Sequence, residues 1–456
     1  MDETTARRYH YTAVAGSGMS ALAQFQAMTA AKVSGSDRAL DKGEQAATRA
    51  ALEKQGIVIY PQDGSGVGPD CQSVIVSTAV EATVADYVAA KAQDIPIVHR
   101  AEMLTRLAAQ YRTIAVGGTS GKSTVVAMIF EILQGVGRQP SVITGGNLVC
   151  LEKQGLIGNA WFGGSDLLVI EADESDGSIV QYAPHIGIVL NLSKDHKEVD
   201  EVAELFARFR AQTTGAFIVG EAENLTHLKD KSTVFGFGDG AKIRGEDLSL
   251  TSIGSAFRVG TTRFTLPVPG KHNIDNALAA IAVCQALGVA LDEMVTPLAL
   301  FQGVARRFQS LGVVDEIEVI DDFAHNPVKV QAAIETAHLR GSRVLAIYQP
   351  HGFTPTRFLR PDFVESFSTA LRPDDRLWLL EIFYAGGTAQ RDFSAAEIVT
   401  DIVAKGKNAE FAETRAVLQK RLLEEAHPGD LILIMGARDP SLTEFGRELV
   451  HSLEAR

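Results

Sequence analysis

The fold of this chain is decided by one stretch, Gly118-Thr119-Ser120-Gly121-Lys122-Ser123-Thr124. Residues 113–116 before it form an apolar run typical of a buried strand, and residues 125–133 behind it are typical of a helix. A glycine loop between a strand and a helix start directs backbone N–H groups at an anion. Lys122 is placed to reach terminal phosphates, and the Ser123 and Thr124 hydroxyls are suitable ligands for Mg²⁺. The stretch is therefore predicted to bind ATP and Mg²⁺.

One position departs from the usual phosphate-binding pattern. Val116 stands where that pattern has its first glycine. A glycine-rich turn without a ligand is the alternative, but such a turn gives no reason for a lysine followed by two hydroxyls. ATP binding is the better prediction.

Length and composition restrict the class of protein. A chain of 456 residues, 46% hydrophobic and 22% charged, is typical of a soluble enzyme with two to four domains. The net charge of −13, without a run of lysine or arginine, argues against a nucleic-acid partner. Its three cysteines match neither a zinc spacing nor a disulfide framework. The polar N-terminus and the lack of an apolar run near ~20 residues predict a cytoplasmic protein that does not insert into membranes.

Residues 1–108 have the alternating pattern of a small α/β domain. Four strand-like runs are separated by helical segments, at residues 11–15, 33–37, 56–60 and 73–77. This alternation predicts a parallel, doubly wound sheet. The first run leads into a glycine loop, Gly16-Ser17-Gly18-Met19-Ser20, at the strand end where such sheets bind ligands. A purely structural turn and a nicotinamide dinucleotide site are alternatives, although the third glycine of the dinucleotide fingerprint is missing.

Two further α/β domains are expected along the chain. The second begins with the phosphate loop, and its apolar runs at 167–170 and 186–190 are typical of strands buried on both faces. Strands of the third are expected at residues 318–320, 344–348, 377–380 and 431–435. We therefore predict an α/β protein with a Rossmann-like N-terminal domain, a central domain like a P-loop ATPase and a Rossmann-like C-terminal domain. The expected boundaries are 1–108, 109–303 and 304–456.

Polar residues follow two central strands, which we expect to be neighbours. The segment 171–176, EADESD, has four carboxylates in six residues, and like charges so close together favour a bound cation. His196 follows the next strand. Beside the phosphate loop, Ser123, Glu171 and His196 together predict a Mg²⁺ site. A solvated acidic turn and a structural histidine are the alternatives.

Further polar candidates precede a helix or follow strands. Asn276, at the start of an alanine-rich helix, is suited either to cap that helix or to contact an adenine edge. Arg306 and Arg307 offer fixed cations for phosphate oxygens, with a surface ion pair as the alternative. Asp321 ends a strand and is suited to ribose hydroxyls. Three more candidates follow strand ends of the third domain: His325, His351 and Arg357. Their placement predicts a cleft between the second and third domains.

Together these residues resemble the Mur ligase family, whose members build the peptide of bacterial peptidoglycan. The resemblance covers essentially the whole chain. Its specific elements, in family order, are GTSGKST at 118–124, EADESD at 171–176, Asn191 with Asp195-His196, HNIDNA at 272–277, RRF at 306–308 and DDFAHNP at 321–327. Within the family the chain is most similar to the branch that joins L-alanine to UDP-N-acetylmuramate. The segments RAEML at 100–104 and QPH at 349–351 agree with that branch.

The resemblance implies a cytoplasmic ligase, monomeric or homodimeric, that uses ATP and Mg²⁺ in peptidoglycan biosynthesis and so serves cell-wall biogenesis, cell shape and cell division. ATP would phosphorylate the carboxylate of UDP-N-acetylmuramate, and an amine would attack the acyl phosphate. The implied catalytic residues are Lys122, Glu171, His196 and His325. The implied ATP site comprises Gly118, Thr119, Ser120, Gly121, Lys122, Ser123, Thr124, Asn276, Arg307 and Asp321. The implied substrate-binding residues are Gly16, Ser17, Gly18, Met19, Ser20, Asp37, Ser77, His351 and Arg357. Closure of the third domain over the second would keep water away from the acyl phosphate.

The expected acceptor site departs from the family pattern at two positions. Gly352 and Pro355 stand where the branch has arginines, which removes two cations suited to a carboxylate. One alternative is therefore a recycling ligase that attaches a ready-made murein peptide, and another is a Mur-type ligase with a different amino-acid acceptor.

More distant classes fit the residues less well. A folate-type polyglutamate ligase would not require the domain of the first glycine loop. An NAD oxidoreductase would leave Lys122 without a purpose. A binding protein without activity would have lost one of Lys122, Glu171 or His196, and all three are present.

Overall fold

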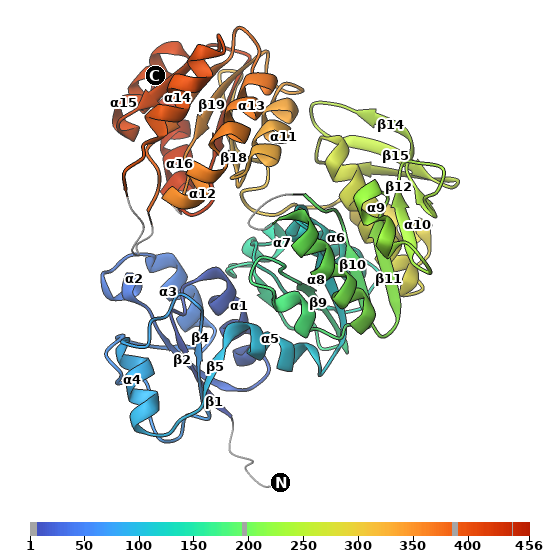
Figure 1. Cartoon of the computed structure of the whole chain (residues 1–456), viewed down its shortest axis with the longest axis vertical. Helices are drawn as coiled ribbons and strands as arrows, with labels where there is room; N and C mark the ends of the chain where they lie inside the picture. The colour runs from blue at the N-terminus through green and yellow to red at the C-terminus, as the bar shows by residue number, and fades with distance from the viewer. Residues whose placement is uncertain (1–6, 194–197, 385–390, 440) are drawn as a thin grey trace. The chain divides into compact units, whose positions relative to one another are not determined.

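The structure is a computed structural model that describes residues 7–193, 198–384, 391–439 and 441–456. Within these residues it contains three large β-sheets with helices on their faces, and one small sheet (Figure 1). The chain divides into two compact units, one of residues 1–249 and 255–304 and one of residues 250–254 and 305–456. The first two large sheets belong to the first unit, and the third large sheet belongs to the second.

The first sheet has the strand order β3-β2-β1-β4-β5, and its neighbouring strands are parallel. Its strands are β1 (Arg8–Thr12), β2 (Lys32–Ser36), β3 (Val58–Tyr60), β4 (Ser73–Val76) and β5 (Ile97–His99). The helices between them are α1 (Ser17–Met28), α2 (Arg38–Asp41), α3 (Ala46–Lys54), α4 (Ala85–Ala92) and α5 (Arg100–Ala108). This order confirms the Rossmann-like architecture. The strand order reverses at β1, so the glycine loop that follows β1 lies where such sheets bind ligands.

Strand β1 begins and ends earlier than the predicted run at 11–15. Ala13 adopts a left-handed conformation with φ of 62°, which ends the strand at Thr12. After this turn the N–H of Val14 donates to the carbonyl of Ser36 at 3.0 Å. The turn therefore joins the start of the glycine loop to the end of β2.

The second sheet has the order β13-β12-β11-β10-β6-β9-β7-β8 and is parallel except between β7 and β8. Its strands are β6 (Arg112–Gly117), β7 (Ser141–Ile143), β8 (Ala160–Trp161), β9 (Leu167–Glu171), β10 (Ile186–Val189), β11 (Ala216–Gly220), β12 (Thr233–Gly236) and β13 (Ile243–Arg244). The prediction that the strands before Glu171 and His196 are neighbours is wrong. Strand β6 lies between them, with Val116 paired to Glu171 of β9 and Gly117 paired to Val189 of β10. Residues that follow β9 and β10 therefore flank the phosphate loop from both sides.

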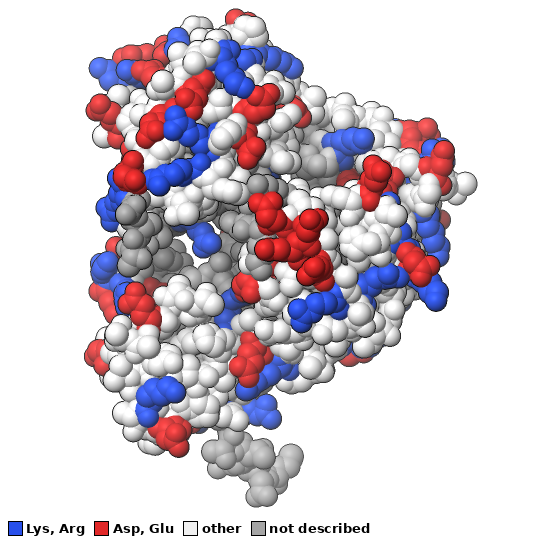
Figure 2. Space-filling model, viewed as in Figure 1, with Lys and Arg blue, Asp and Glu red and all other residues white. Residues whose placement is uncertain are grey.

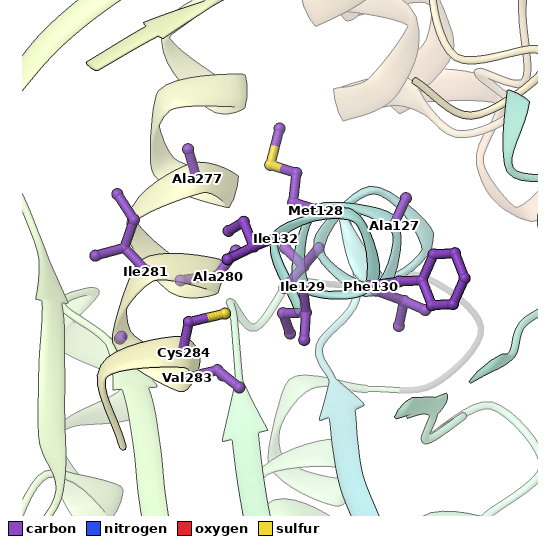
Figure 3. Close-up of a cluster of buried hydrophobic side chains, with 14 of the residues drawn as sticks. Ala127, Met128, Ile129, Phe130, Ile132, Ala277, Ala280, Ile281, Val283 and Cys284 are labelled. Carbon is purple, nitrogen blue, oxygen red and sulfur yellow. The ribbon is translucent and has the colours of Figure 1, made fainter. Parts of the chain in front are cut away.

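The helices of this part are α6 (Lys122–Gly135), α7 (Val149–Glu152), α8 (Val199–Gln212), α9 (Lys271–Ala286) and α10 (Leu291–Ala299), with 3₁₀ turns η1 (Ser178–Gln181) and η2 (Glu223–Leu228). Helix α6 carries an apolar run from Val125 to Leu133 that is almost wholly buried. It packs against the alanine-rich helix α9, where Ile132 lies beside Ala280 (Figure 3). The small side chains of α9 allow the two helices to approach closely, which fixes the start of α6 in the core.

The first two sheets share one hydrophobic core. Phe25 of α1 makes edge-to-face contacts with Tyr111 and Phe162, with ring centroids 5.8 Å and 6.0 Å apart. The same buried cluster includes Tyr11 of β1 and Leu168 of β9. The glycine loop and the phosphate loop are therefore held in one rigidly packed body.

A small sheet of three strands, in the order β14-β15-β16, was not expected from the sequence. Its strands are β14 (Glu246–Leu250), β15 (Ser255–Val259) and β16 (Thr262–Leu266). Phe257 and Phe264 pair across the antiparallel β15–β16 hairpin, with ring centroids 5.3 Å apart. These strands are short and mix charged with apolar residues, so their pattern resembles that of a loop.

The third large sheet has the order β17-β18-β22-β19-β20-β21 and is parallel except between β17 and β18. Its strands are β17 (Gln309–Val314), β18 (Ile317–Asp322), β19 (Arg343–Tyr348), β20 (Arg376–Leu380), β21 (Ala409–Ala412) and β22 (Asp430–Met435). Its helices are α11 (Pro327–Ala337), α12 (Phe353–Phe358), α13 (Arg360–Ala370), α14 (Ala395–Ala404), α15 (Arg415–Glu425) and α16 (Ser441–Glu454). All four predicted strands of this domain are present. Two buried clusters lie wholly within this unit, so it has a core of its own.

The charged surface agrees with the composition. On the face shown in Figure 2, lysine and arginine are interspersed with aspartate and glutamate, and the described residues form no broad basic field there. None of the helices within the described ranges combines the length and the apolar character that crossing a bilayer requires.

Candidate active site

The phosphate loop connects β6 to α6 with two glycines in conformations that other residues rarely adopt. Gly118 has φ of 135° and Gly121 has φ of 88°. Gly121 caps the start of α6, so the free N–H groups of the first helical turn face the loop. A side chain is also excluded at Gly121 by packing, because a Cβ there would lie 2.5 Å from Oδ1 of Asn276. Asn276 therefore lies against the loop, as an adenine or phosphate contact would require.

Asn191, which follows β10, holds the other side of the loop. Its Oδ1 accepts from Oγ1 of Thr119 and from the N–H of Ser120, both at 2.9 Å, and its Nδ2 donates to the Ser120 carbonyl at 3.0 Å. Thr119 also exchanges a hydrogen bond with Ser193 at 2.8 Å. These contacts fix the loop before any ligand binds, which is the preorganisation that phosphate binding exploits.

Lys122 is partly buried and contacts carboxylates from the segment after β9. Its Nζ donates to Oε2 of Glu174 and to the carbonyl of Gly118, each at 2.7 Å, and lies 4.0 Å from Oδ1 of Asp173. Burial alone would lower the pKa of Lys122, but attraction by Glu174 and Asp173 outweighs it and raises that pKa. Lys122 is therefore fully charged while these carboxylates hold it.

Glu171 ends β9 beside the loop. Its Oε1 accepts from the Thr144 hydroxyl and from the N–H of Gly145, the latter at 2.9 Å. Ser123, 6% exposed, borders the same glycine pair, because a Cβ on Gly146 would lie 3.3 Å from Ser123 Oγ. The Glu171 carboxylate and the Ser123 hydroxyl thus lie on the two sides of Gly145-Gly146.

These oxygen donors fit Mg²⁺, which binds through one or two protein oxygens and takes its other ligands from phosphates and water. Within the described residues no three histidine, cysteine, aspartate or glutamate side chains gather into a complete metal site. Mg²⁺ held by such donors would take its remaining ligands from a bound nucleotide and water. His196, the third predicted ligand, lies outside the described residues.

The first glycine loop is tied to its surroundings by polar contacts. Asp37 caps α2 and accepts from the N–H of Ala15 at 3.1 Å, so it borders the loop, and its contact with a nucleotide sugar stays a prediction. Gly18 lies under Arg100, whose Cδ would be 3.0 Å from a Cβ on that glycine. Arg100 donates to Asp176 at 3.2 Å. Ser77 follows β4 and is half-buried, and its contact with a nucleotide sugar stays a prediction.

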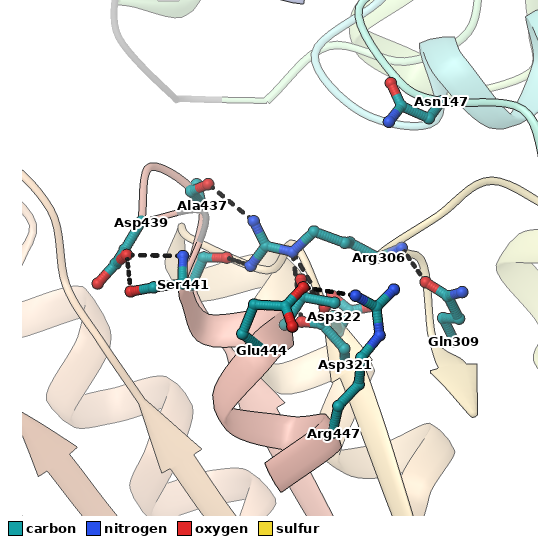
Figure 4. Close-up of polar contacts among 12 residues, drawn as sticks. Asn147, Arg306, Gln309, Asp321, Asp322, Ala437, Asp439, Ser441, Glu444 and Arg447 are labelled. Atoms are coloured by element: carbon teal, nitrogen blue, oxygen red, sulfur yellow. Dashed lines mark hydrogen bonds and ion pairs between the residues drawn. The ribbon is translucent and has the colours of Figure 1, made fainter. Parts of the chain in front are cut away.

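In the second unit, Asp321 is fully buried and is bound by neighbours of its own domain. Arg306 approaches it at 3.1 Å through Nε, and the Thr443 hydroxyl donates to it at 2.6 Å. Arg306 also donates to the carbonyls of Gly436 and Ala437 (Figure 4). Arg306 therefore connects β18 to the residues that follow β22 through hydrogen bonds. The ribose contact of Asp321 stays a prediction.

Arg307, His325 and His351 lie near one another around Phe323. The guanidinium of Arg307 stacks 5.0 Å from the centre of the Phe323 ring, and the rings of His325 and His351 meet edge to face at 5.6 Å. Burial, reinforced by the charge of Lys329, holds the pKa of His325 well below its ordinary value. At neutral pH His325 is therefore a neutral imidazole whose Nδ1 contacts the Phe323 carbonyl at 2.9 Å.

The two departures from the family pattern are neighbours in space. Gly352 has φ of 72°, and a Cβ there would lie 3.0 Å from Cγ of Pro355, so an arginine at 352 would be strained and obstructed. Arg357, two residues later, forms an ion pair with Asp392 and stacks on Phe393 at 5.7 Å. Positions 352 and 355 therefore supply no positive charge to the predicted acceptor site, and Arg357 remains its predicted cation.

Several residues of the site had been given no role in our predictions: Arg100, Thr144, Asn159, Glu174 and Asn191. Thr144 and Asn191 follow strand ends, and the rule that ligands gather there could have found them. Glu174 was part of the recognised acidic segment, but its pairing with Lys122 depends on how that segment folds back. Arg100 and Asn159 each form hydrogen bonds between residues around the first sheet and residues around the second. No local sequence pattern predicts such long-range contacts.

An enzyme that handles a nucleoside triphosphate is the class that this loop and this fold define. Three family models match the chain. The catalytic domain of the Mur ligase family matches residues 8–112, the Mur ligase middle domain matches residues 116–284, and the glutamate ligase domain of Mur ligases matches residues 306–438. The chain belongs to the Mur ligase family, a family of ATP-dependent amide ligases.

Individual relatives agree with this assignment over the full length. The chain is 33% identical to a UDP-N-acetylmuramate–L-alanine ligase of Dictyoglomus turgidum, covering 95% of this chain and 94% of that protein. It is 31% identical to the protein of the same name from Thermobifida fusca, covering 98% and 96%. The crystal structure of the UDP-N-acetylmuramate–alanine ligase of Thermotoga maritima superposes with a TM-score of 0.82 at 27% identity, over 98% of this chain and 99% of that one. A murein peptide ligase from Psychrobacter arcticus shares the fold, with a TM-score of 0.70 at 21% identity.

Proposed function

We propose that this chain joins L-alanine to UDP-N-acetylmuramate in peptidoglycan synthesis, with hydrolysis of ATP to ADP and phosphate. The relatives that are 33% and 31% identical over nearly the whole chain carry that activity in their names, which supports the same substrates here. The proposal includes Mg²⁺, the domain boundaries 1–108, 109–303 and 304–456, and the cytoplasmic location expected from the sequence.

The observation that carries the proposal is the grouping at the phosphate loop. Lys122, Ser123 and Glu171 come from the ends of adjacent strands β6 and β9 and face one loop. A charged lysine, free helix N–H groups and oxygen donors suited to Mg²⁺ are what the transfer of a phosphoryl group requires. The charge that develops on the transferred group would be stabilised here by positions fixed in advance.

In the first step, a carboxylate oxygen of the muramate would attack the γ-phosphorus of ATP, and the bond to the β,γ-bridging oxygen would break. Lys122 would exchange its contact with Glu174 for the phosphate oxygens, and Asn191 would keep the loop in place. Ser123, Glu171 and His196 would hold Mg²⁺, which when bound supplies positive charge at the β- and γ-phosphates. The product of this step is an acyl phosphate.

In the second step, the amine of alanine would attack the acyl carbon, and phosphate would leave as the amide forms. His325 is uncharged at neutral pH because burial lowers its pKa, and we assign to it the proton that the attacking amine loses. His351 and Arg357 are proposed to face the acceptor, and the loop Gly16–Ser20 with Asp37 and Ser77 to face the nucleotide sugar. Asn276, Arg307 and Asp321 are proposed to contact the nucleotide.

The test is release of phosphate by the purified chain with ATP, Mg²⁺, UDP-N-acetylmuramate and one acceptor at a time. The acceptors are L-alanine, glycine, L-serine and the tripeptide L-alanyl-γ-D-glutamyl-meso-diaminopimelate. Release that is fastest with L-alanine supports the proposal. Release only with the tripeptide would assign the chain to murein recycling, an outcome that Gly352 and Pro355 make worth including. No release with any acceptor would reject the ligase function.

Replacement of the central lysine gives the matching residue test. Lys122→Ala is expected to lower kcat by about 10³-fold, because it removes a preorganised charge from the transferring group. Lys407→Ala is the control, since Lys407 also holds a single carbonyl, that of Leu371 at 2.6 Å, but lies in the third sheet's α14–β21 turn. Equal activity of the two variants would remove Lys122 from the mechanism.

A further inference from the structure

Asn159 occupies an unusual position between the first two sheets. It is 0% exposed and directly precedes β8 of the second sheet. Its Nδ2 donates to the carbonyl of Ser17 at 2.8 Å and to Oγ of Ser20 at 2.9 Å. Ser17 and Ser20 lie in the first turn of α1, within the stretch Gly16–Ser20 that the sequence predicted as a glycine loop. One buried amide of the second sheet therefore holds the loop of the first.

The orientation of the Asn159 side-chain amide is fixed by two glutamines, Gln24 and Gln55. Oδ1 of Asn159 accepts from Nε2 of Gln24 at 2.7 Å, and Oε1 of Gln24 accepts from Nε2 of Gln55 at 2.9 Å. Gln24 itself is fully buried on α1. Because each amide is held by the next, Asn159 cannot rotate without breaking a buried hydrogen bond, which is costly.

The backbone of Asn159 connects it, through Thr144, to Glu171, the carboxylate of the candidate magnesium site. Its carbonyl accepts from the N–H of Thr144 at 3.0 Å. The hydroxyl of Thr144 donates to Glu171, and the next N–H, that of Gly145, donates to the same carboxylate oxygen at 2.9 Å. Three successive hydrogen bonds, through Asn159 and Thr144, therefore connect the first glycine loop to Glu171.

We infer that Asn159 is a positioning residue that fixes the glycine loop of the first sheet relative to the Thr144–Glu171 pair, and so sets the approach of the nucleotide sugar to the phosphate loop. This inference rests on the proposed function for the identity of the sugar. Its physical content, the coupling of two loops through one side chain, is a property of the protein alone. Phosphoryl transfer to a carboxylate needs the reacting atoms near contact distance, and small misplacements are costly.

The kinetic test compares Asn159→Ala with Thr113→Val. Thr113 is a buried residue of the same unit whose hydroxyl donates to the Ala108 carbonyl at 2.7 Å, at the end of β6 remote from the phosphate loop. Asn159→Ala is expected to raise KM for UDP-N-acetylmuramate and to lower kcat, each by about ten-fold, while KM for ATP changes less than about two-fold. Thr113→Val is expected to keep all three constants within about two-fold. Asn159→Asp, which keeps the acceptor for Gln24 but loses both donated hydrogen bonds, is expected to follow the alanine variant.

Hydrogen exchange of the chain without substrates gives a second readout that does not depend on turnover. In Asn159→Ala, the amides of residues 16–20 and of Gly145 are both expected to exchange faster than in the wild type and in Thr113→Val. Faster exchange confined to residues around 159 would overturn the inference, as would kinetic constants equal to those of the control. A wild type that does not use UDP-N-acetylmuramate would reject the proposed function, and the exchange data would still decide for or against the coupling.

Discussion

Gly121 combines two demands that no other residue type meets. Its φ of 88° is strained for any side chain, and the space of its missing Cβ is taken by Oδ1 of Asn276 at 2.5 Å. Gly137, at the far end of α6, has a similar φ of 76°, but no atom lies within 4 Å of the position that its Cβ would take. The two glycines therefore share the backbone conformation and differ only in whether a neighbour occupies the space.

This difference predicts the effect of the same substitution at both glycines. Gly137→Ala is expected to cost about 1 kcal/mol of stability from backbone strain and to leave turnover unchanged. Gly121→Ala is expected to displace Asn276 as well, raising KM for ATP by about ten-fold or more. Steady-state kinetics and thermal unfolding of both variants check this. A normal KM for ATP in Gly121→Ala would mean that Asn276 does not contact the nucleotide.

For single residues, the sequence predicted which side chains lie near the phosphate loop, but not which neighbours they contact. Lys122, Ser123 and Glu171 stand next to strands or glycines, and the sequence identified them from that setting alone. The partner of Lys122 could not be chosen among the four carboxylates of 171–176, because the choice depends on how the segment turns after Ala172. Arg306 illustrates the same limit, since it was predicted to serve phosphate or a surface pair and instead holds the buried Asp321.

Helix α6 has a second function besides carrying the phosphate loop. Glu131, in its third turn, accepts from the N–H of Gln302 through Oε2 at 3.0 Å, and so holds the segment that leaves the second sheet. The thiol of Cys150 lies beside the same carboxylate. Burial raises the pKa of Glu131 to about 7, and burial together with Glu131 raises the pKa of Cys150 to about 12. The protonation state of this carboxyl group therefore changes near neutral pH.

The sign of this dependence follows from the direction of the shift. The folded chain holds the Glu131 proton more tightly than the unfolded chain, whose ordinary pKa is 4.5. Stability from this group is thus fully present below pH 4.5 and is lost as the pH rises to about 7, by at most about 3 kcal/mol.

Glu131→Gln, which keeps an acceptor for Gln302 but has no charge, is expected to remove this loss. The measurement is the free energy of unfolding at pH 5 and pH 8. The variant should gain about 1–3 kcal/mol relative to wild type at the higher pH. Glu335→Gln on α11, an exposed glutamate, is the control. An equal pH response of Glu131→Gln and wild type would show that the group is ionised throughout.

Among the elements, the strands with continuous apolar runs were predicted correctly. Strands such as β9, β19 and β22 are buried on both faces, so all positions except one terminal residue of each are apolar and the pattern is unambiguous. The predictions named neither the small sheet β14–β16 nor the edge strand β17, and they also left out β5, β7, β8, β11, β12, β13 and β21. Strand β14 is exposed along almost its whole length, and β17 is half-covered, so neither carries the apolar run by which the others are recognised.

In the whole molecule, the clusters of buried side chains do not follow the boundaries between the hydrogen-bonded sheets. The first two sheets form separate hydrogen-bonded systems, but one buried cluster, which includes Tyr11 and Leu168, contains side chains of both. The parallel, doubly wound architecture could be predicted from alternating helices and strands, but the strand order could not, since β6 lies between β9 and β10. The joining of two sheets through Phe25 and Phe162 could not, because the residues are far apart in sequence and either could equally have faced its own sheet.

This division predicts how fragments behave. Residues 305–456 have two cores of their own and are expected to fold alone with a cooperative thermal transition. Residues 1–304 are expected to do the same. Residues 1–108 are expected to stay unfolded or to aggregate, because Phe25 and its neighbours would lose the apolar surface they pack against. Near-ultraviolet circular dichroism and calorimetry of the three fragments decide this, and a cooperative transition of 1–108 would contradict it.

The pairing of Lys122 with Glu174 has a consequence for how the chain meets its nucleotide. In a molecule of net charge −13, the one lysine of the phosphate loop is already compensated before any ligand arrives. Long-range attraction therefore cannot draw in a free polyanion, and a nucleotide whose own charge is masked by a chelated cation meets less repulsion. Raising the ionic strength should then speed the encounter rather than slow it, the opposite of what an uncompensated lysine pocket would show.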